Sequence, residues 1–166
     1  SQTTEVVLED CRVPVDYLLG GMDKLNNKLE KARSGQKTGG ANALATFELT
    51  RPFVGASAIG IARAAYEFTL EYLNEQTIEG KPALDHPGTH QAIADVATEI
   101  DAARLLVQRA GWMGRNGVPL LGGQGSMSKL KCGDVAMCAT AKSMDIIGPD
   151  AWSTDLPLEK WYRDAK

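Results

Sequence analysis

Apolar residues recur at helical spacing between Thr50 and Gln76. Successive members of the pattern are four or three positions apart, which places them along one stripe of a helix. The members are Val54, Ala58, Ile61, Ala65, Phe68 and Tyr72. Glycine, alanine and serine fill many positions between them, so a neighbouring backbone can come close. The pattern predicts a tightly packed bundle helix with Thr50-Arg51-Pro52 at its start.

Three later segments extend the helical pattern. One face of residues 89–112 carries Ile93, Val96, Ile100, Ala103, Val107 and Ala110. A less regular stripe in residues 126–147 contains Met127, Leu130, Met137, Ala141 and Met144. Asp134 interrupts that stripe and would need a polar partner if buried. A shorter helix is predicted within residues 153–166, with Pro157 in its first turn.

These helices predict an all-α fold, an up-down four-helix bundle over residues 41–166. Residues 1–20 differ, because apolar and acidic residues alternate around Val6 and Leu8, a pattern that predicts a short strand. Residues 21–40 are basic, with Leu25 and Leu29 at helical spacing, and predict a short surface helix followed by a Gly-Gly break.

Composition narrows the function classes. The chain has 166 residues, 43% of them hydrophobic, and a net charge of −3. Positive and negative residues are mixed, so the sequence does not predict the basic surface of a nucleic-acid-binding protein. No apolar run approaches membrane-spanning length. We expect a soluble, cytoplasmic protein, with the mitochondrial matrix as the alternative if a targeting segment precedes the first residue. Pro87 interrupts the His86 and His90 pair, so we predict no metal site.

Several short motifs together resemble one known family. They are Phe47-Glu48 with Thr50-Arg51-Pro52, His90 to Ile93, Ala103 to Trp112, Lys129 with Gly133-Asp134, and Pro157 to Lys166. In this order they are similar to the C-terminal helical domain of the FAD-dependent acyl-CoA dehydrogenases. The resemblance runs from about Gly39 to the last residue. Residues 1–20 resemble the end of the family's middle β-domain, and the bundle would be truncated at its C-terminus.

The resemblance implies a reaction and its partners. Family members remove the α-proton and β-hydride of an acyl-CoA thioester, and their electrons pass through FAD to an electron-transfer flavoprotein. They assemble through the helical bundle, so a homo- or hetero-oligomer is expected here.

No general base is found in this chain. In most members a glutamate that follows the segment matched by Arg163 to Lys166 is the base, and in some members the base stands where this chain has Thr50. Glu48 lies about 200° from Thr50 around a helix, which makes it a poor substitute. We therefore predict no catalytic residue, and an isolated chain without activity.

Substrate and cofactor candidates follow from the same resemblance. Arg51, with Thr50, is predicted to contact acyl-CoA at its pantetheine or nucleotide part; a salt bridge at the bundle mouth is the alternative for Arg51. The predicted FAD contacts are His90, Gln91, Thr77, Lys81, Asp145 and Gly148.

The flavin motifs depart from the family pattern. Glu75 or Gln76 stands where the family has an arginine, Ile78 or Glu79 replaces an aromatic residue, and Pro149 replaces a glycine. An acidic residue repels a diphosphate, and proline offers no N–H. The alternative function is therefore a non-catalytic structural subunit of a hetero-oligomeric acyl-CoA dehydrogenase.

Overall fold

The computed structural model describes residues 4–36 and 41–166, with side chains from residue 44 onward in the second range. The chain divides into two compact units, residues 1–42 and 43–166. The second unit contains the family motifs.

The first unit contains a short 3-10 turn, η1 (Val15–Tyr17), and one helix, α1 (Gly21–Arg33). The helix confirms the predicted basic helix, with Lys31 and Arg33 in its last turn, where positive charge is favourable. The strand predicted around Val6 and Leu8 does not form, and both side chains are exposed. A strand needs a neighbour for its backbone hydrogen bonds, and none pairs with these residues in the described parts of the chain. The Gly-Gly break lies outside the described residues.

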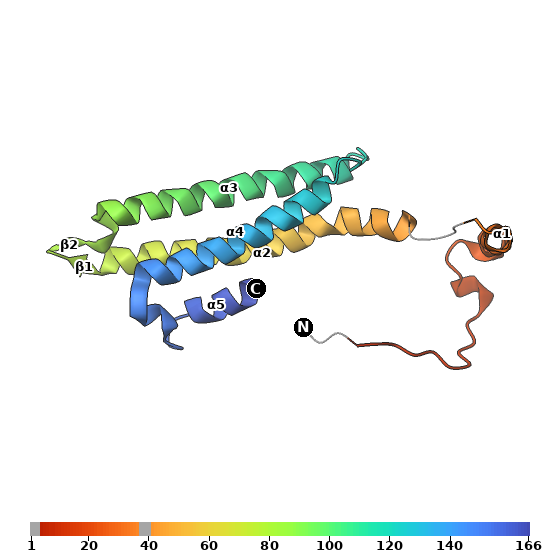
Figure 1. Cartoon of the computed structure of the whole chain (residues 1–166), viewed down its shortest axis with the longest axis horizontal. Coiled ribbons are helices and arrows are strands. Elements are labelled where there is room, and N and C mark those ends of the chain that lie inside the picture. Colours follow the sequence, from red (N-terminus) through yellow and green to blue (C-terminus); the bar gives the residue numbers. More distant parts are fainter. Residues whose placement is uncertain (1–3, 37–40) are drawn as a thin grey trace. The chain divides into compact units, whose positions relative to one another are not determined.

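The second unit is an up-down helical bundle (Figure 1). Its long helices are α2 (Ala41–Glu75), α3 (Pro87–Arg115) and α4 (Gln124–Ile147), and its last helix is the short α5 (Leu158–Ala165). A hairpin of β1 (Thr77–Ile78) and β2 (Lys81–Pro82), with the turn η2 (Ala83–Asp85), joins α2 to α3. The turn η3 (Gly148–Trp152) follows α4. The predicted all-α bundle is confirmed.

Helix α2 is longer than the sequence pattern indicated. Thr50-Arg51-Pro52 lies inside the helix and not at its start, so that part of the prediction is wrong. A proline inside a helix has no N–H to give to the carbonyl four residues earlier, which here belongs to Glu48. The consequence appears at the contact between α2 and α4 described below.

The core is built largely from small residues. Its larger cluster joins α2, α3 and α4 through Ile59, Ala62, Val96, Ile100, Ala103, Cys132, Val135, Ala136 and Ala139. A second cluster joins α2 to the end of the chain through Ala65, Met144, Ala151 and Leu158. Buried hydroxyls are satisfied locally: Thr69 donates to the Ala65 carbonyl at 2.7 Å and Thr140 to the Ala136 carbonyl at 2.8 Å.

The predicted buried face agrees with the structure on α3 but not on α4. On α3, Val96, Ile100, Ala103 and Ala110 are buried, as the pattern predicted. On α4 the predicted stripe is largely wrong, because Met127 and Leu130 are 45% and 66% exposed. The α4 residues that face the core include Ser128, Cys132, Val135 and Ala139, whose small size allows close packing. Asp134 is exposed and needs no buried partner.

Among the described residues, no helix is both long enough and apolar enough to cross a membrane.

Candidate functional site

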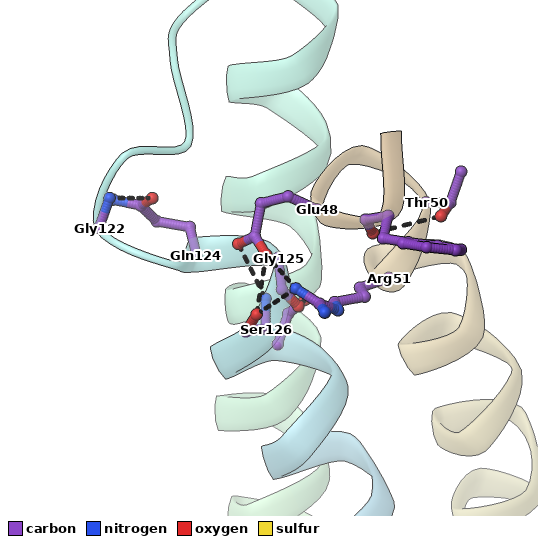
Figure 2. A network of polar contacts seen from close by, with 9 residues as sticks. Glu48, Thr50, Arg51, Gly122, Gln124, Gly125 and Ser126 are labelled. Carbon is purple, nitrogen blue, oxygen red and sulfur yellow. Dashed lines mark hydrogen bonds and ion pairs between the residues drawn. The ribbon is translucent and has the colours of Figure 1, made fainter. Parts of the chain in front are cut away.

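Three side chains form a polar network where α2 passes the start of α4 (Figure 2). Nη1 of Arg51 donates to Oε2 of Glu48 at 2.5 Å and to Oγ of Ser126 at 2.6 Å. The Ser126 hydroxyl donates to the same Oε2 at 2.8 Å. Glu48 and Arg51 are one helical turn apart on α2, so they share a face. We call these three residues the Glu48 clamp.

The carboxylate of Glu48 also caps α4. Its Oε1 accepts a hydrogen bond of 3.0 Å from the backbone N–H of Ser126, the third residue of that helix. The N-cap residue of α4 is Gly123, which has no side chain with which to cap. Unpaired N–H groups and the positive end of the helix dipole favour an anion at this position. A residue of α2 therefore does the work of an N-cap residue for α4.

The backbones of α2 and α4 meet at Gly125. A Cβ atom added there would lie 2.0 Å from the Glu48 carbonyl oxygen, far inside any real contact distance. Pro52 is the residue whose missing N–H leaves that carbonyl without its usual partner within the helix. Pro52 and Gly125 together let the two helices approach closely enough for the clamp to form.

The clamp keeps Glu48 ionised. The hydrogen bond from the Ser126 hydroxyl lowers the pKa of Glu48, and the Ser126 N–H and Arg51 act in the same direction against the effect of desolvation. A general base that works near neutral pH needs a raised pKa instead. Glu48 is thus suited to holding structure and not to abstracting a proton.

Arg51 keeps donors available for a ligand. A guanidinium has five N–H donors, and both hydrogen bonds of Arg51 within the described chain leave from Nη1. Its side chain is 38% exposed, against 16% for Glu48. The predicted salt bridge is therefore present, and Nε and Nη2 make no hydrogen bond to the described residues.

The surface around Arg51 is apolar. On the face of α2 that carries Arg51, Phe47 and Val54 are 57% and 56% exposed. Thr50 lies among them, and its hydroxyl donates to the Phe47 carbonyl at 3.2 Å. One turn beyond, a hollow of about 260 Å³ between α2, α4 and α5 begins at Val54 and includes Lys129. Thr50 and Arg51, neighbours in the sequence, thus lie next to exposed apolar side chains of α2.

The six predicted FAD contacts gather at the opposite end of the bundle. Thr77 and Lys81 lie on the hairpin, His90 and Gln91 in the first turns of α3, and Asp145 and Gly148 at the end of α4 (Figure 1). Antiparallel helices bring these three segments together. Arg51 and Thr77 are separated by about 39 Å along α2, at 1.5 Å per residue. The two sets of residues therefore lie at opposite ends of the bundle.

The charge at this end suits only part of a flavin cofactor. The hydroxyl of Thr77, the amide of Gln91 and the imidazole of His90 can hydrogen bond to a flavin. Lys81, however, shares a surface hollow with Glu79 and Asp85, and Glu79 holds the tip of the hairpin with a positive φ of 52°. These residues fit a neutral part of FAD and fit its diphosphate poorly.

A tyrosine fixes the turn after α4 at this end. The Tyr72 hydroxyl on α2 donates to Asp150 of η3 at 2.7 Å. The same hydrogen bond raises the pKa of Tyr72. Asp150 is thereby held close to the end of α2 and adds further negative charge to this end of the bundle.

Two residues of the Glu48 clamp region were missed from the sequence. Neither Gly125 nor Ser126 was predicted as a site residue, although the predicted helix over residues 126–147 nearly matches α4, which begins at Gln124. A glycine pair followed closely by serine was the available signal, since Gly123 adopts a positive φ of 72° just before the helix. Their partner Glu48 lies too far away in the sequence to be identified from spacing.

Comparison with known proteins agrees with the motifs. The family model described as acyl-CoA dehydrogenase, C-terminal domain, matches residues 37–166. The probable acyl-CoA dehydrogenase FadE25 of Mycobacterium tuberculosis is 35% identical over this whole chain, which spans 39% of that relative.

Solved structures give the same result. Butyryl-CoA dehydrogenase from Megasphaera elsdenii matches with a TM-score of 0.71 at 31% identity, over 78% of this chain and 34% of that one. A chain from a study of the electron transferring flavoprotein of Acidaminococcus fermentans matches with a TM-score of 0.69 at 32% identity, over 72% of this chain and 31% of its own length.

Proposed function

Because the chain belongs to the acyl-CoA dehydrogenase family and contains its C-terminal domain, we propose that it is part of a flavin-dependent acyl-CoA dehydrogenase. The reaction is α,β-dehydrogenation of an acyl-CoA thioester, with electrons passed to an electron-transfer flavoprotein. The observation that carries this proposal is the match of the family model to residues 37–166. The chain spans 39% of the length of the curated FadE25 relative.

Arg51 and Thr50 are the substrate-binding residues in this proposal. Among the described residues, Nε and Nη2 of Arg51 have no hydrogen-bond partner, and Phe47 and Val54 expose apolar side chains on the same face of α2. Together they offer hydrogen bonds to polar oxygens of acyl-CoA and an apolar surface along its chain. Glu48 keeps the guanidinium in place and does not take part in proton transfer.

FAD is the cofactor of the family, and when bound it accepts the hydride. In this chain His90, Gln91 and Thr77 would hold it by hydrogen bonds, with Lys81, Asp145 and Gly148 beside them. The separation of about 39 Å from Arg51 supports an oligomer in which this end of the bundle meets the cofactor of a neighbouring subunit. The substrate-binding end would then serve a second active site.

The second candidate function is a structural subunit that packs against an active dehydrogenase. Glu79 and Asp85 beside Lys81 favour it, because they weaken binding of a diphosphate. Such a subunit would need neither a catalytic base nor its own flavin.

The visible absorption spectrum of the purified full-length protein distinguishes the dehydrogenase from the structural subunit. The dehydrogenase proposal predicts an oxidised-flavin spectrum with close to one flavin per chain. A folded helical oligomer without flavin, alone and after co-purification with its native partners, would contradict it and support the structural subunit.

A further inference from the structure

The Glu48 clamp changes the charge that Arg51 presents to a ligand. Glu48 bonds to Nη1 from one side, so the donors on Nε and Nη2 lie on the far side of the guanidinium (Figure 2). A group bound there is attracted by the guanidinium and repelled by the carboxylate behind it. For distances of about 4 Å and 6 Å, Coulomb's law makes the repulsion about two thirds of the attraction.

The Glu48 carboxylate affects a neutral oxygen bound to Arg51 less than it affects a phosphate. A carbonyl or amide oxygen needs a directed N–H donor and carries no net charge, so the carboxylate takes little away from its hydrogen bond. A phosphate carries a full negative charge, so the carboxylate repels it and offsets much of its attraction to the guanidinium. Because the carboxylate is held by Ser126 at both its hydroxyl and its N–H, it cannot easily move aside for an anion.

We propose that Glu48 and Ser126 make Arg51 selective for a neutral carbonyl oxygen of acyl-CoA, in the thioester or the pantetheine arm, and not for its phosphates. This inference rests on the proposed function, since it assumes that Arg51 binds acyl-CoA. It assigns Glu48 and Ser126 as positioning residues that determine which part of the substrate Arg51 contacts.

Two ligands that differ only in the nucleotide test the proposal. Butanoyl-CoA and S-butanoyl-pantetheine share the thioester and the pantetheine amides, and only the first has phosphates. We expect Arg51→Ala in the full-length protein to weaken binding of both ligands by the same factor, about tenfold, as the loss of one charge-assisted hydrogen bond. Isothermal titration calorimetry measures both. Arg63→Ala is the matched control, because Arg63 lies on the same helix in an exposed pair with Glu67. It should change neither affinity.

Glu48→Gln tests the role of the carboxylate. Removing its negative charge should raise the affinity for adenosine 3′,5′-bisphosphate severalfold and make that gain sensitive to salt. Thermal unfolding followed by circular dichroism establishes that the variant is folded. The difference in butanoyl-CoA affinity between the unsubstituted protein and Arg51→Ala should vary little with salt. This comparison does not require a Glu48 variant.

The outcomes are distinguishable. If Arg51→Ala weakens butanoyl-CoA and leaves S-butanoyl-pantetheine unchanged, Arg51 binds a phosphate; the selectivity proposal is then wrong, while the substrate-binding role stands. If Arg51→Ala changes neither affinity, the substrate-binding role itself is wrong, and the inference fails with it. Equal losses of affinity for the two ligands support the substrate-binding role of Arg51 and its selectivity for a neutral oxygen.

Discussion

The carboxylate of Glu48, on α2, accepts a hydrogen bond of 3.0 Å from the backbone N–H of Ser126, at the start of α4. This contact fixes the start of α4 against the N-terminal part of α2 and holds Arg51 beside both. The proposed substrate-binding end of the bundle depends on it, and so do the first two predictions.

Gly125→Ala should destabilise the bundle. The added methyl group would lie 2.0 Å from the Glu48 carbonyl oxygen, so the two backbones must separate. We expect the free energy of unfolding to fall by about 1–3 kcal/mol, as for other overpacked sites. Urea unfolding measures it. Gly133→Ala on the same helix is the control, because its Cβ would meet no atom within 4 Å. It should be neutral or stabilising by about 0.5–1 kcal/mol. Equal effects of the two substitutions would show that the close approach is absent.

Glu48→Gln should reduce stability in a pH-dependent way. The folded protein has a lowered pKa at Glu48, so the carboxylate contributes stability above its ordinary value of 4.5 and loses it as the pH falls through the lowered value. At neutral pH we expect the variant to be less stable by about 1 kcal/mol, as for loss of a helix cap. Denaturant unfolding between pH 7 and strongly acidic pH should show the difference shrinking. A difference that is constant with pH would exclude the charge as its source.

Tyr72→Phe should loosen the turn after α4. The substitution removes the 2.7 Å hydrogen bond to Asp150 and should lower the free energy of unfolding by about 0.5–1.5 kcal/mol. In the unsubstituted protein, the raised pKa of Tyr72 places its ionisation above the ordinary value of 10.0. Asp150→Asn should lower that pKa, which a spectrophotometric titration of tyrosinate can follow. If Asp150→Asn leaves the titration unchanged, the two residues do not interact in solution.

Leu158→Ala should test the docking of α5. Leu158 is fully buried with Ala65, Met144 and Ala151, so the truncation leaves a cavity in the second cluster. We expect a loss of about 2–5 kcal/mol. Leu130→Ala is the control, because that side chain is 66% exposed, and its effect should stay within about 0.5 kcal/mol. A small effect at Leu158 as well would mean that α5 is not packed against the other helices.

The sequence predicted the bundle better than the faces of its helices. On α3 the predicted stripe contains buried residues, and Val96 and Ile100 were identified correctly. On α4 the core is made by Ser128, Cys132 and Ala139, while Met127 and Leu130 are exposed. Hydrophobicity ranks methionine and leucine above serine, and it does not record that close helix packing requires small side chains.

The site was predictable only in part. The family motif predicted Arg51 and Thr50 as substrate-binding residues, a role that stays a prediction, and the salt bridge of Arg51 was predicted as the alternative. Its network partner Ser126 was not, because the contact depends on the way that Pro52 and Gly125 let α2 and α4 approach. The local pattern of apolar and polar residues does not predict a contact between segments that are far apart in the sequence. The predicted FAD contacts do gather at one end of the bundle, and their role stays a prediction.

The most direct test of the proposed function is reduction of the flavin by substrate. The full-length protein, loaded with FAD and kept without oxygen, would be mixed with straight-chain acyl-CoAs of increasing length while its visible absorption is recorded. Our account predicts that at least one acyl-CoA bleaches the oxidised-flavin band, and that Arg51→Ala requires a higher concentration of it for the same bleaching. A flavin that stays oxidised with every acyl-CoA, in a protein that dithionite still reduces, would contradict the account.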